Sequence, residues 1–364
     1  MRLLFTGYTQ SSDFRCPQAW LGRISFYTGI LEALAEDHAV CSVEHIGWSG
    51  RVERGSVQYE FLPLGPLARR LPLRKHRFMR NWRPDAVLLN GFHHPLQLLQ
   101  LRQALGPAPK LLVLHRADRP FRGLRRRLQQ EAARQVDGWL FTARAQAAAW
   151  IEAGIIRDES RVHEVIQASS RFVPADRGAA RAALGVEGAP LCLWVGRLDA
   201  NKDPLTVLRA FAGFQAQCPG ARLYLVHQSR ELLPALQELL AQHPAAAAAV
   251  HFVGPVPHAA LETWLNAADL LLSGSHSEGS GIAVAEAMSC GCIPLVTDIA
   301  SFRRMTGSLV PRYPPGDAGA LQQLLAQSIS WDHGPLRAGL VREFERELSF
   351  GAIARQINHL LGSG

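Results

Sequence analysis

Short apolar segments alternate with helical patterns through both halves of the chain, and this alternation most restricts the possible fold. It predicts parallel sheets covered by helices. In the first half we expect strands at Arg2–Thr6, Ala39–His45, Ala86–Asn90, Lys110–His115, Gly138–Thr142 and Val162–Val165. In the second half we expect strands at Leu191–Val195, Arg222–Val226, Val250–Val253, Leu270–Ser273 and Ile293–Thr297.

Helical patterns fill the intervals between these strands, so the fold class is α/β. The helices expected in the first half are Phe26–Glu36, Pro95–Ala104, Leu124–Val136 and Ala143–Ala153. Those expected in the second half are Pro204–Gln217, Glu231–Gln242, Ala259–Ala267 and Ile282–Ser289, with a final helix at Gly351–Leu361.

A polar stretch rich in small residues separates the two series, and the 364 residues are about twice the length of one domain. We therefore expect Rossmann-like domains at 1–170 and 191–345, joined by a linker at 171–190. The closing segment, 346–364, can cross back to the first domain. Because ligands bind at the carboxyl ends of parallel strands, we expect the two doubly wound sheets to face a central cleft.

The net charge of +8 is unevenly distributed along the chain. Residues 1–171 hold 25 Lys and Arg against 15 Asp and Glu, whereas the remainder holds 14 against 16. This difference indicates that the two domains meet different partners.

No apolar stretch is long enough to span a membrane, and the N-terminus reads as a buried strand rather than a signal peptide. We therefore expect a cytoplasmic protein. The six cysteines form no C-x-x-C pair and match no zinc spacing, so we expect no metal site and interpret Cys290 and Cys292 as small core residues.

The segment from Ser277 to Gly291 carries the strongest chemical signal. Its Gly-Ser-Gly turn allows close approach of a ligand, and a helix then begins near Gly281. The free N–H groups at that helix end favour a diphosphate.

Two carboxylates, Glu278 and Glu286, lie eight residues apart in this segment, about 12 Å along a helix. Acceptor-only carboxylates suit the hydroxyls of a sugar and of a ribose on either side of a diphosphate. An arbitrary E-x7-E pattern is usually solvated surface, but Glu286 stands among apolar residues and a buried Glu needs a partner.

Two cations, Arg197 and Lys202, follow the strand that opens the second half. At a strand's carboxyl end they can neutralise a departing diphosphate. Read alone, such a loop more often holds two solvated charges.

With these motifs in order, the second half resembles the retaining glycosyltransferase family four, which has the GT-B fold. The likeness covers about residues 138–345. The matching motifs are V-G-R-L-D-x-x-K-D-P at Val195–Pro204, F-V-G-x-V at Phe252–Val256, S-E-G-x-G-x-x-x-x-E-A-M-x-C-G from Ser277, P-L-V-T-D at Pro294–Asp298 and P-P-G-D at Pro314–Asp317.

The resemblance implies a role for each matched residue. Arg197 and Lys202 correspond to the diphosphate pair, Glu278 to the carboxylate beside the transferred sugar, and Glu286 to the ribose carboxylate. The other donor contacts implied are Gly279, Ser280, Gly281 and Ile282 for sugar and phosphate, and Val253, Gly254 and Val256 near the base.

In the first half, Leu111–His115 resembles the family strand that ends in a histidine near the donor sugar, so His115 is a candidate sugar contact and catalytic residue. Two segments depart from the family pattern. Gln18–Gly22 has one Gly where the family has a Gly-Gly loop, and Asp298–Arg304 lacks a Gly-Gly pair.

The function implied is transfer of a hexose-type sugar from a nucleotide-diphosphate sugar to a hydroxyl of a glycan or lipid-linked acceptor. By resemblance the reaction is retaining and needs no metal or other cofactor. The alternatives are a donor-binding protein with little turnover, a sugar-nucleotide epimerase or a phosphorylase. A nicotinamide dehydrogenase ranks low, because no G-x-G-x-x-G follows a strand.

Basic residues mixed with apolar ones gather in two segments, Arg69–Arg83 and Arg116–Arg127. Such a mixture can lie on an anionic membrane surface, which would make the protein peripheral on the inner face of the membrane, or bind an acidic acceptor. A solvated basic face is the plain alternative, and we expect no nucleic-acid partner because no such motif is present.

Overall fold

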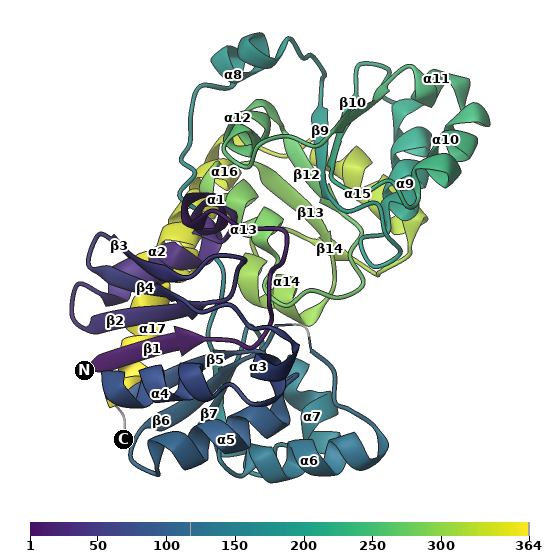
Figure 1. Ribbon diagram of the computed structural model, residues 1–364. Coiled ribbons are helices and arrows are strands. Elements are labelled where there is room, and N and C mark those ends of the chain that lie inside the picture. Colours follow the sequence, from purple (N-terminus) through teal and green to yellow (C-terminus); the bar gives the residue numbers. More distant parts are fainter. Residues whose placement is uncertain (117, 363–364) are drawn as a thin grey trace. The chain divides into compact units, whose positions relative to one another are not determined.

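The computed structural model describes residues 1–116 and 118–362, so the last two residues of the predicted segment 346–364 lie outside the described residues. The chain forms two compact units (Figure 1). Met1–Ser169 and the chain end from Phe350 form the first domain, and Ser170–Ser349 form the second. Each is a sheet covered by helices, the α/β fold class that the alternating pattern predicts.

The first domain contains an eight-stranded sheet in the order β3-β4-β2-β1-β5-β6-β7-β8, parallel except for the pair β3–β4. Its strands are β1 (Arg2–Thr6), β2 (Ala39–Glu44), β3 (Gly50–Arg54), β4 (Val57–Phe61), β5 (Ala86–Asn90), β6 (Lys110–Leu114), β7 (Gly138–Phe141) and β8 (Val162–Glu164). Its helices are α1 (Pro17–Arg23), α2 (Ser25–Leu34), α3 (Pro66–Arg70), α4 (Leu73–Trp82), α5 (Pro95–Leu105), α6 (Gly123–Ala133), α7 (Ala148–Glu152) and α17 (Phe350–Gly362).

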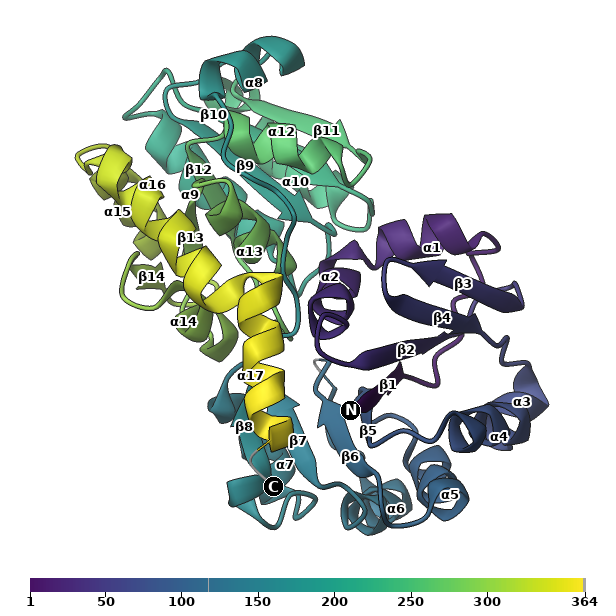
Figure 2. The ribbon, with the colours of Figure 1, turned by 90° about the vertical axis from the view of Figure 1, so that its left-hand side faces the viewer.

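Helices cover both faces of this sheet, as its nearly continuous apolar strands require. One core joins alternate strand residues such as Leu4 and Val87 to Met79 of α4 and Leu101 of α5. The last helix, α17, packs against α2 in the same domain (Figure 2). Gly29 permits this contact, since a Cβ there would lie 2.6 Å from the Phe350 ring.

The second domain contains a fully parallel six-stranded sheet in the order β11-β10-β9-β12-β13-β14. Its strands are β9 (Leu191–Gly196), β10 (Arg222–His227), β11 (Val250–Gly254), β12 (Leu270–Ser273), β13 (Ile293–Thr297) and β14 (Arg312–Tyr313). Its helices are α8 (Arg177–Leu184), α9 (Pro204–Gln215), α10 (Leu233–Ala241), α11 (Pro244–Ala247), α12 (Ala260–Ala267), α13 (Ile282–Ser289), α14 (Ala300–Thr306), α15 (Ala318–Ser328) and α16 (His333–Glu343).

The order of these strands fixes where a ligand can bind. From β9 the chain winds outward to β10 and β11, then returns to β12 and winds the other way to β14. The switch point therefore lies between β9 and β12, and the loops that leave their carboxyl ends are where such sheets bind ligands.

Residues 171–190, predicted as a linker, belong to the second domain and include α8. Asp176 caps this helix by accepting a hydrogen bond from the Ala179 N–H at 2.6 Å, and Gly185 ends it in the left-handed conformation. The helix predicted at Ala143–Ala153 begins with a 3-10 turn at Arg144–Ala147 before α7.

Two predicted surface cations lie inside the first domain. Lys75 is 1% exposed, donates to the Gly7 carbonyl and to His45 Nε2, and lies 3.4 Å from the Tyr8 ring centre. Arg116 donates to Asn90 Oδ1 at 2.9 Å. The two basic segments are therefore not exposed at every position, because these two side chains reach inward to satisfy polar groups at strand ends.

The other arginines of the two segments are exposed, as predicted. Leu67, Leu71 and Leu73 near the start of α4 are 82%, 58% and 72% exposed, and Leu124 is 80% exposed. Among the described residues, no helix is long and apolar enough to cross a membrane.

Candidate active site

The loops after β9 and β12 bring two predicted site residues into contact. Lys202 Nζ donates to Glu278 Oε1, and the Ser275 hydroxyl donates to the same oxygen at 2.7 Å. The Lys202 and Glu278 side chains are 24% and 14% exposed, so the pair is only partly open to solvent. A cation and a carboxylate therefore meet at the switch point of the sheet.

Backbone contacts hold these two loops together. The His276 N–H donates to the Asn201 carbonyl at 2.8 Å, and the Asn201 amide donates to the Ser277 carbonyl at 3.0 Å. A Cβ on Gly274 would lie 2.6 Å from the Asp203 carbonyl oxygen. The loops can approach this closely only because residue 274 is a glycine.

Arg197, the second predicted cation, lies in the same loop but points elsewhere. Its guanidinium lies 3.1 Å from Asp199 Oδ2, and its side chain is 65% exposed. Asp199 also accepts from the Lys202 N–H at 2.9 Å, which ties the two cationic residues to one carboxylate. Arg197 is therefore a largely exposed side chain at the edge of the site, whereas Lys202 lies within it.

Helix α13 begins at the predicted glycine turn. Gly281 precedes it with φ +60°, and a Cβ there would lie 2.7 Å from the Phe302 ring. Among the residues that the structure describes, no side chain caps the helix, so its first N–H groups remain suited to an anionic ligand. Ser280 is 9% exposed next to this helix end.

Glu286, predicted to bind ribose, is buried on α13 with 3% exposure. Its Oε1 lies 2.6 Å from His258 Nε2, at the start of the segment that leads into α12. Val253 and Gly254 form the end of β11, and Val256 follows in the loop toward His258. Glu286 therefore has the partner that burial of a carboxylate requires.

His115 belongs to the first domain, where it follows β6. It is 8% exposed, and its Nε2–H donates to the Asp118 carbonyl at 3.2 Å. The other ring nitrogen, Nδ1, is buried and has no hydrogen-bond partner among the described residues. Burial lowers the pKa of His115, which keeps the imidazole neutral and Nδ1 an acceptor.

Three further contacts, two in the second domain and one in the first, do not follow from the motifs. Ser275 and His258 each bind one of the two predicted glutamates. In the first domain, His93 Nε2 lies 2.7 Å from Asp118 Oδ1, and that aspartate side chain is 1% exposed. His258 and His93 have partners far away in sequence, so only the fold brings them together, whereas Ser275 lies three residues before Glu278.

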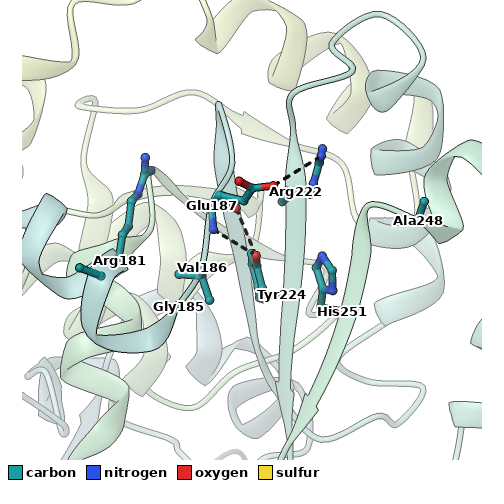
Figure 3. Close-up of a pocket in the computed structure, with 9 residues that line it drawn as sticks. Arg181, Gly185, Val186, Glu187, Arg222, Tyr224, Ala248 and His251 are labelled. Carbon is teal, nitrogen blue, oxygen red and sulfur yellow. Dashed lines mark hydrogen bonds and ion pairs between the residues drawn. The ribbon is translucent and has the colours of Figure 1, made fainter.

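A hollow of about 550 Å³ lies at the opposite, amino end of the second sheet (Figure 3). Tyr224 stands at its centre between Arg181 and His251, with Arg222 above. Its arginines are engaged in the fold, because Arg181 pairs with Asp269 at 2.7 Å and Arg222 donates to the Pro219 and Ala221 carbonyls at 2.9 Å. None of the predicted donor residues lines this hollow.

The described residues include no group of three or more His, Cys, Asp or Glu side chains that could hold a metal ion. Cys290 and Cys292 are 6% and 0% exposed, which confirms that they are core residues.

Residues 189–328, which include the Lys202–Glu278 pair and Glu286, match the family described as glycosyl transferases group 1. The second domain is therefore similar to that family over most of its length. The matched residues are those in which the predicted donor motifs of the second half lie.

Relatives of known name match the same region. A D-inositol 3-phosphate glycosyltransferase 2 from Catenulispora acidiphila is 36% identical over 163 residues, which are 40% of this chain and 38% of that protein. A D-inositol 3-phosphate glycosyltransferase from Geodermatophilus obscurus is 35% identical over 190 residues, 48% of this chain and 42% of its own length. The chain thus spans about two fifths of the length of these relatives.

Solved structures match the whole chain in fold. HepE from Anabaena, in complex with UDP-glucose, has a TM-score of 0.73 at 17% identity, with 100% of both chains covered. A sucrose-phosphate synthase from Thermosynechococcus elongatus has a TM-score of 0.72 at 19% identity and covers 99% of this chain and 98% of its own. The predicted GT-B fold class of two Rossmann-like domains is confirmed.

Proposed function

We propose that this protein is a retaining glycosyltransferase that moves a hexose-type sugar from a nucleotide-diphosphate sugar to a hydroxyl of a glycan or lipid-linked acceptor. The observation that carries the proposal is the Lys202–Glu278–Ser275 cluster at the switch point of the second sheet. This cluster lies inside the glycosyl transferases group 1 match, next to the uncapped start of α13.

The donor is a UDP-sugar in the first instance. HepE, which shares the fold of the whole chain, binds UDP-glucose, and the curated relatives are glycosyltransferases by name. We assign the sugar to the side of Glu278, the diphosphate to Lys202, Arg197 and the start of α13, and the ribose to Glu286. Val253, Gly254 and Val256 would lie along the base, and Gly279, Ser280 and Ile282 along the sugar and phosphates.

The chemistry demanded of these residues is the stabilisation of a leaving group. As the bond from the anomeric carbon to the diphosphate breaks, negative charge grows on the departing oxygen. Lys202, Arg197 and the N–H groups of α13 neutralise that charge, which is why the reaction needs no metal. The acceptor hydroxyl attacks on the same face and gives its proton to the departing phosphate, so configuration is retained.

Glu278 orients the transferred sugar by accepting hydrogen bonds from its hydroxyls, and Lys202 and Ser275 fix the carboxylate for that task. In the first domain, the buried acceptor Nδ1 of His115 suits a sugar hydroxyl, since a donor supplied by the substrate would satisfy it.

The first domain supplies a basic and apolar surface that suits a lipid-linked acceptor. Arg74, Arg77 and Arg80 on α4 stand beside the exposed Leu71 and Leu73. We propose that the protein works in the cytoplasm and that this surface contacts anionic membrane, because leucines can enter the headgroup region while arginines bind phosphates. Co-sedimentation with phosphatidylglycerol vesicles tests this, and failure to sediment at low salt would remove it.

The experiment that tests the function combines donor binding with product analysis. A panel of UDP-, GDP-, ADP- and dTDP-sugars is screened by thermal shift, where a donor at 100 times its Kd adds about 2.7 kcal/mol of stability. The stabilising donor is then incubated with acceptors, and the anomeric configuration of the product is read by NMR. An inverted product contradicts the retaining mechanism, and an epimerised sugar nucleotide without transfer identifies an epimerase.

A further inference from the structure

Glu286 is held by one imidazole. The Glu286 side chain is 4% exposed, and Oε1 lies 2.6 Å from His258 Nε2, whose side chain is 45% exposed. The structure gives Oε2 no donor among the described residues. One carboxylate oxygen is therefore committed to His258, and the second is the one that a ligand hydroxyl can use.

His258 is itself restrained from the other side by an aromatic ring. The rings of Phe172 and His258 lie 5.2 Å apart with an interplanar angle of 34°, and Phe172 is 8% exposed. The imidazole is thus held between a buried ring and a buried carboxylate, which restricts it to one orientation.

The chain segment that carries Phe172 is fixed on α12. The Val173 N–H donates to Glu262 Oε1 at 2.9 Å, and the Ala175 N–H donates to Asn266 Oδ1 at 2.7 Å. The Asn266 amide returns a hydrogen bond to the Val173 carbonyl at 3.0 Å. These bonds make Phe172 a rigid support rather than a loop side chain that happens to touch His258.

We infer that His258 is a positioning residue that orients the Glu286 carboxylate toward the ribose hydroxyls of the nucleotide. The inference rests on the proposed donor site, in which Glu286 binds ribose. His258 does not touch the nucleotide in this assignment. It fixes which carboxylate oxygen, and in which direction, meets the ribose, much as outer partners orient the ligands of other sites.

A purely structural role for His258 predicts something different. In that case its removal leaves a buried carboxylate without a partner and lowers stability, but the protein would discriminate between nucleotides as before. The two roles are separated by a ratio of affinities, which is insensitive to the amount of folded protein.

The test measures by calorimetry the Kd of UDP and of 2′-deoxy-UDP and 3′-deoxy-UDP. For the wild type we expect UDP to bind about tenfold more tightly than the weaker deoxy analogue, as loss of one hydrogen bond to a charged group predicts. In His258→Ala the ratio should fall to about twofold, because the carboxylate is free to rotate. His258→Gln, whose amide can still donate to Oε1, should restore most of the ratio, and Phe172→Leu should give an intermediate value.

His251→Ala is the matched control. This histidine lies on β11 against Tyr224, 4.7 Å between ring centres, and makes no contact with Glu286 among the described residues. The ratio should be that of the wild type. A wild-type ratio in His258→Ala overturns the inference while the donor site stands.

Two outcomes separate failure of the inference from failure of the function. Wild-type protein that binds UDP without distinguishing the deoxy analogues overturns the placement of ribose at Glu286, and with it the role of His258. Wild-type protein that binds none of the nucleoside diphosphates UDP, GDP, ADP and dTDP overturns the proposed function as well.

Discussion

The two ends of the second sheet both carry ion pairs, but they are built for different purposes. At the carboxyl end, Lys202 meets one carboxylate of the described residues, Glu278, in loops that remain partly open. At the amino end, Asp269 meets three arginines, with Arg181 at 2.7 Å, Arg337 at 3.1 Å and Arg177 at 3.4 Å.

The aspartate also binds the backbone. Asp269 Oδ2 accepts from the Leu191 N–H at 2.8 Å, so it joins the starts of β9 and β12. The three arginines come from α8 and α16, so this cluster links the sheet to these two helices. Charge alone therefore does not identify a ligand site. The ion pair on loops beyond the strands can exchange partners for a ligand, whereas the Asp269 cluster at the starts of the strands stabilises the fold.

The largest expected effect is on turnover at the carboxyl end. Lys202→Ala removes a charge that offsets the leaving diphosphate, and Glu278→Gln removes the carboxylate from the transferred sugar. Each should lower kcat by about tenfold or more, because such groups act mainly in the transition state. The melting temperature should move little, since a partly exposed pair contributes weakly to stability. A near-wild-type kcat in folded variants would contradict the assignment of Lys202 and Glu278 to the donor site.

The reverse pattern is expected at the amino end. Asp269→Asn leaves three arginines facing one another without their carboxylate, so the second domain should lose about 2 kcal/mol of stability, less than for a fully buried pair. That loss corresponds to a fall in melting temperature of about 4–8 °C. Donor affinity and kcat per folded molecule should be unchanged at 20 °C. A loss of donor affinity equal to that of Lys202→Ala would erase the distinction between the two ends.

A smaller effect is expected where backbone and ligand requirements coincide. Gly281→Ala places a methyl group 2.7 Å from the Phe302 ring at a residue with φ +60°. We expect a loss of about 1–2 kcal/mol of stability together with weaker donor binding, since the start of α13 must shift. Gly185→Ala is the control: its φ is +63° and, its chain neighbours aside, no described residue lies within 4 Å of the added methyl, so it should lose stability without losing donor affinity.

The sequence predicted most strands to within a residue, because their apolar runs are short and continuous. It did not predict the hairpin β3–β4, although Val57, Tyr59 and Phe61 alternate with polar residues and are buried. That alternation is typical of a strand with one covered face, but the polar residues of β3 obscured it. Helices α3 and α4 were interpreted only as a charged segment.

The candidate site likewise contains residues that the sequence predicts and residues that it does not. Glu278, Glu286 and Lys202 lie in motifs whose spacing is local, so their positions follow from the sequence. His258 and Asp118 are identified by what they touch, and those contacts join segments far apart in the sequence. Ser275 lies three residues before Glu278 but outside the predicted motif. Lys75 shows the limit most clearly, because a lysine among arginines carries no local sign that it will be 1% exposed.

The smallest predicted effect tests whether charged groups at the carboxyl end of the first sheet make its stability depend on pH. Contact with Asp118 raises the pKa of His93, whereas burial lowers the pKa of its neighbour His94. A histidine whose pKa is raised in the folded state stabilises that state below about pH 6.5, and this contribution is lost as the pH rises through the pKa of the folded state. A histidine whose pKa is lowered makes a contribution of the opposite sign.

His93→Gln should therefore lower the melting temperature by about 1–2 °C at pH 5.5 and by less at pH 8.5, in line with a half-exposed pair. The melting temperature of His94→Gln should rise relative to that of the wild type as the pH falls, because the substitution removes a group that resists protonation. Melting curves of the three proteins at both pH values provide the measurement. Parallel pH profiles for the two variants would show that Asp118 does not distinguish these adjacent histidines.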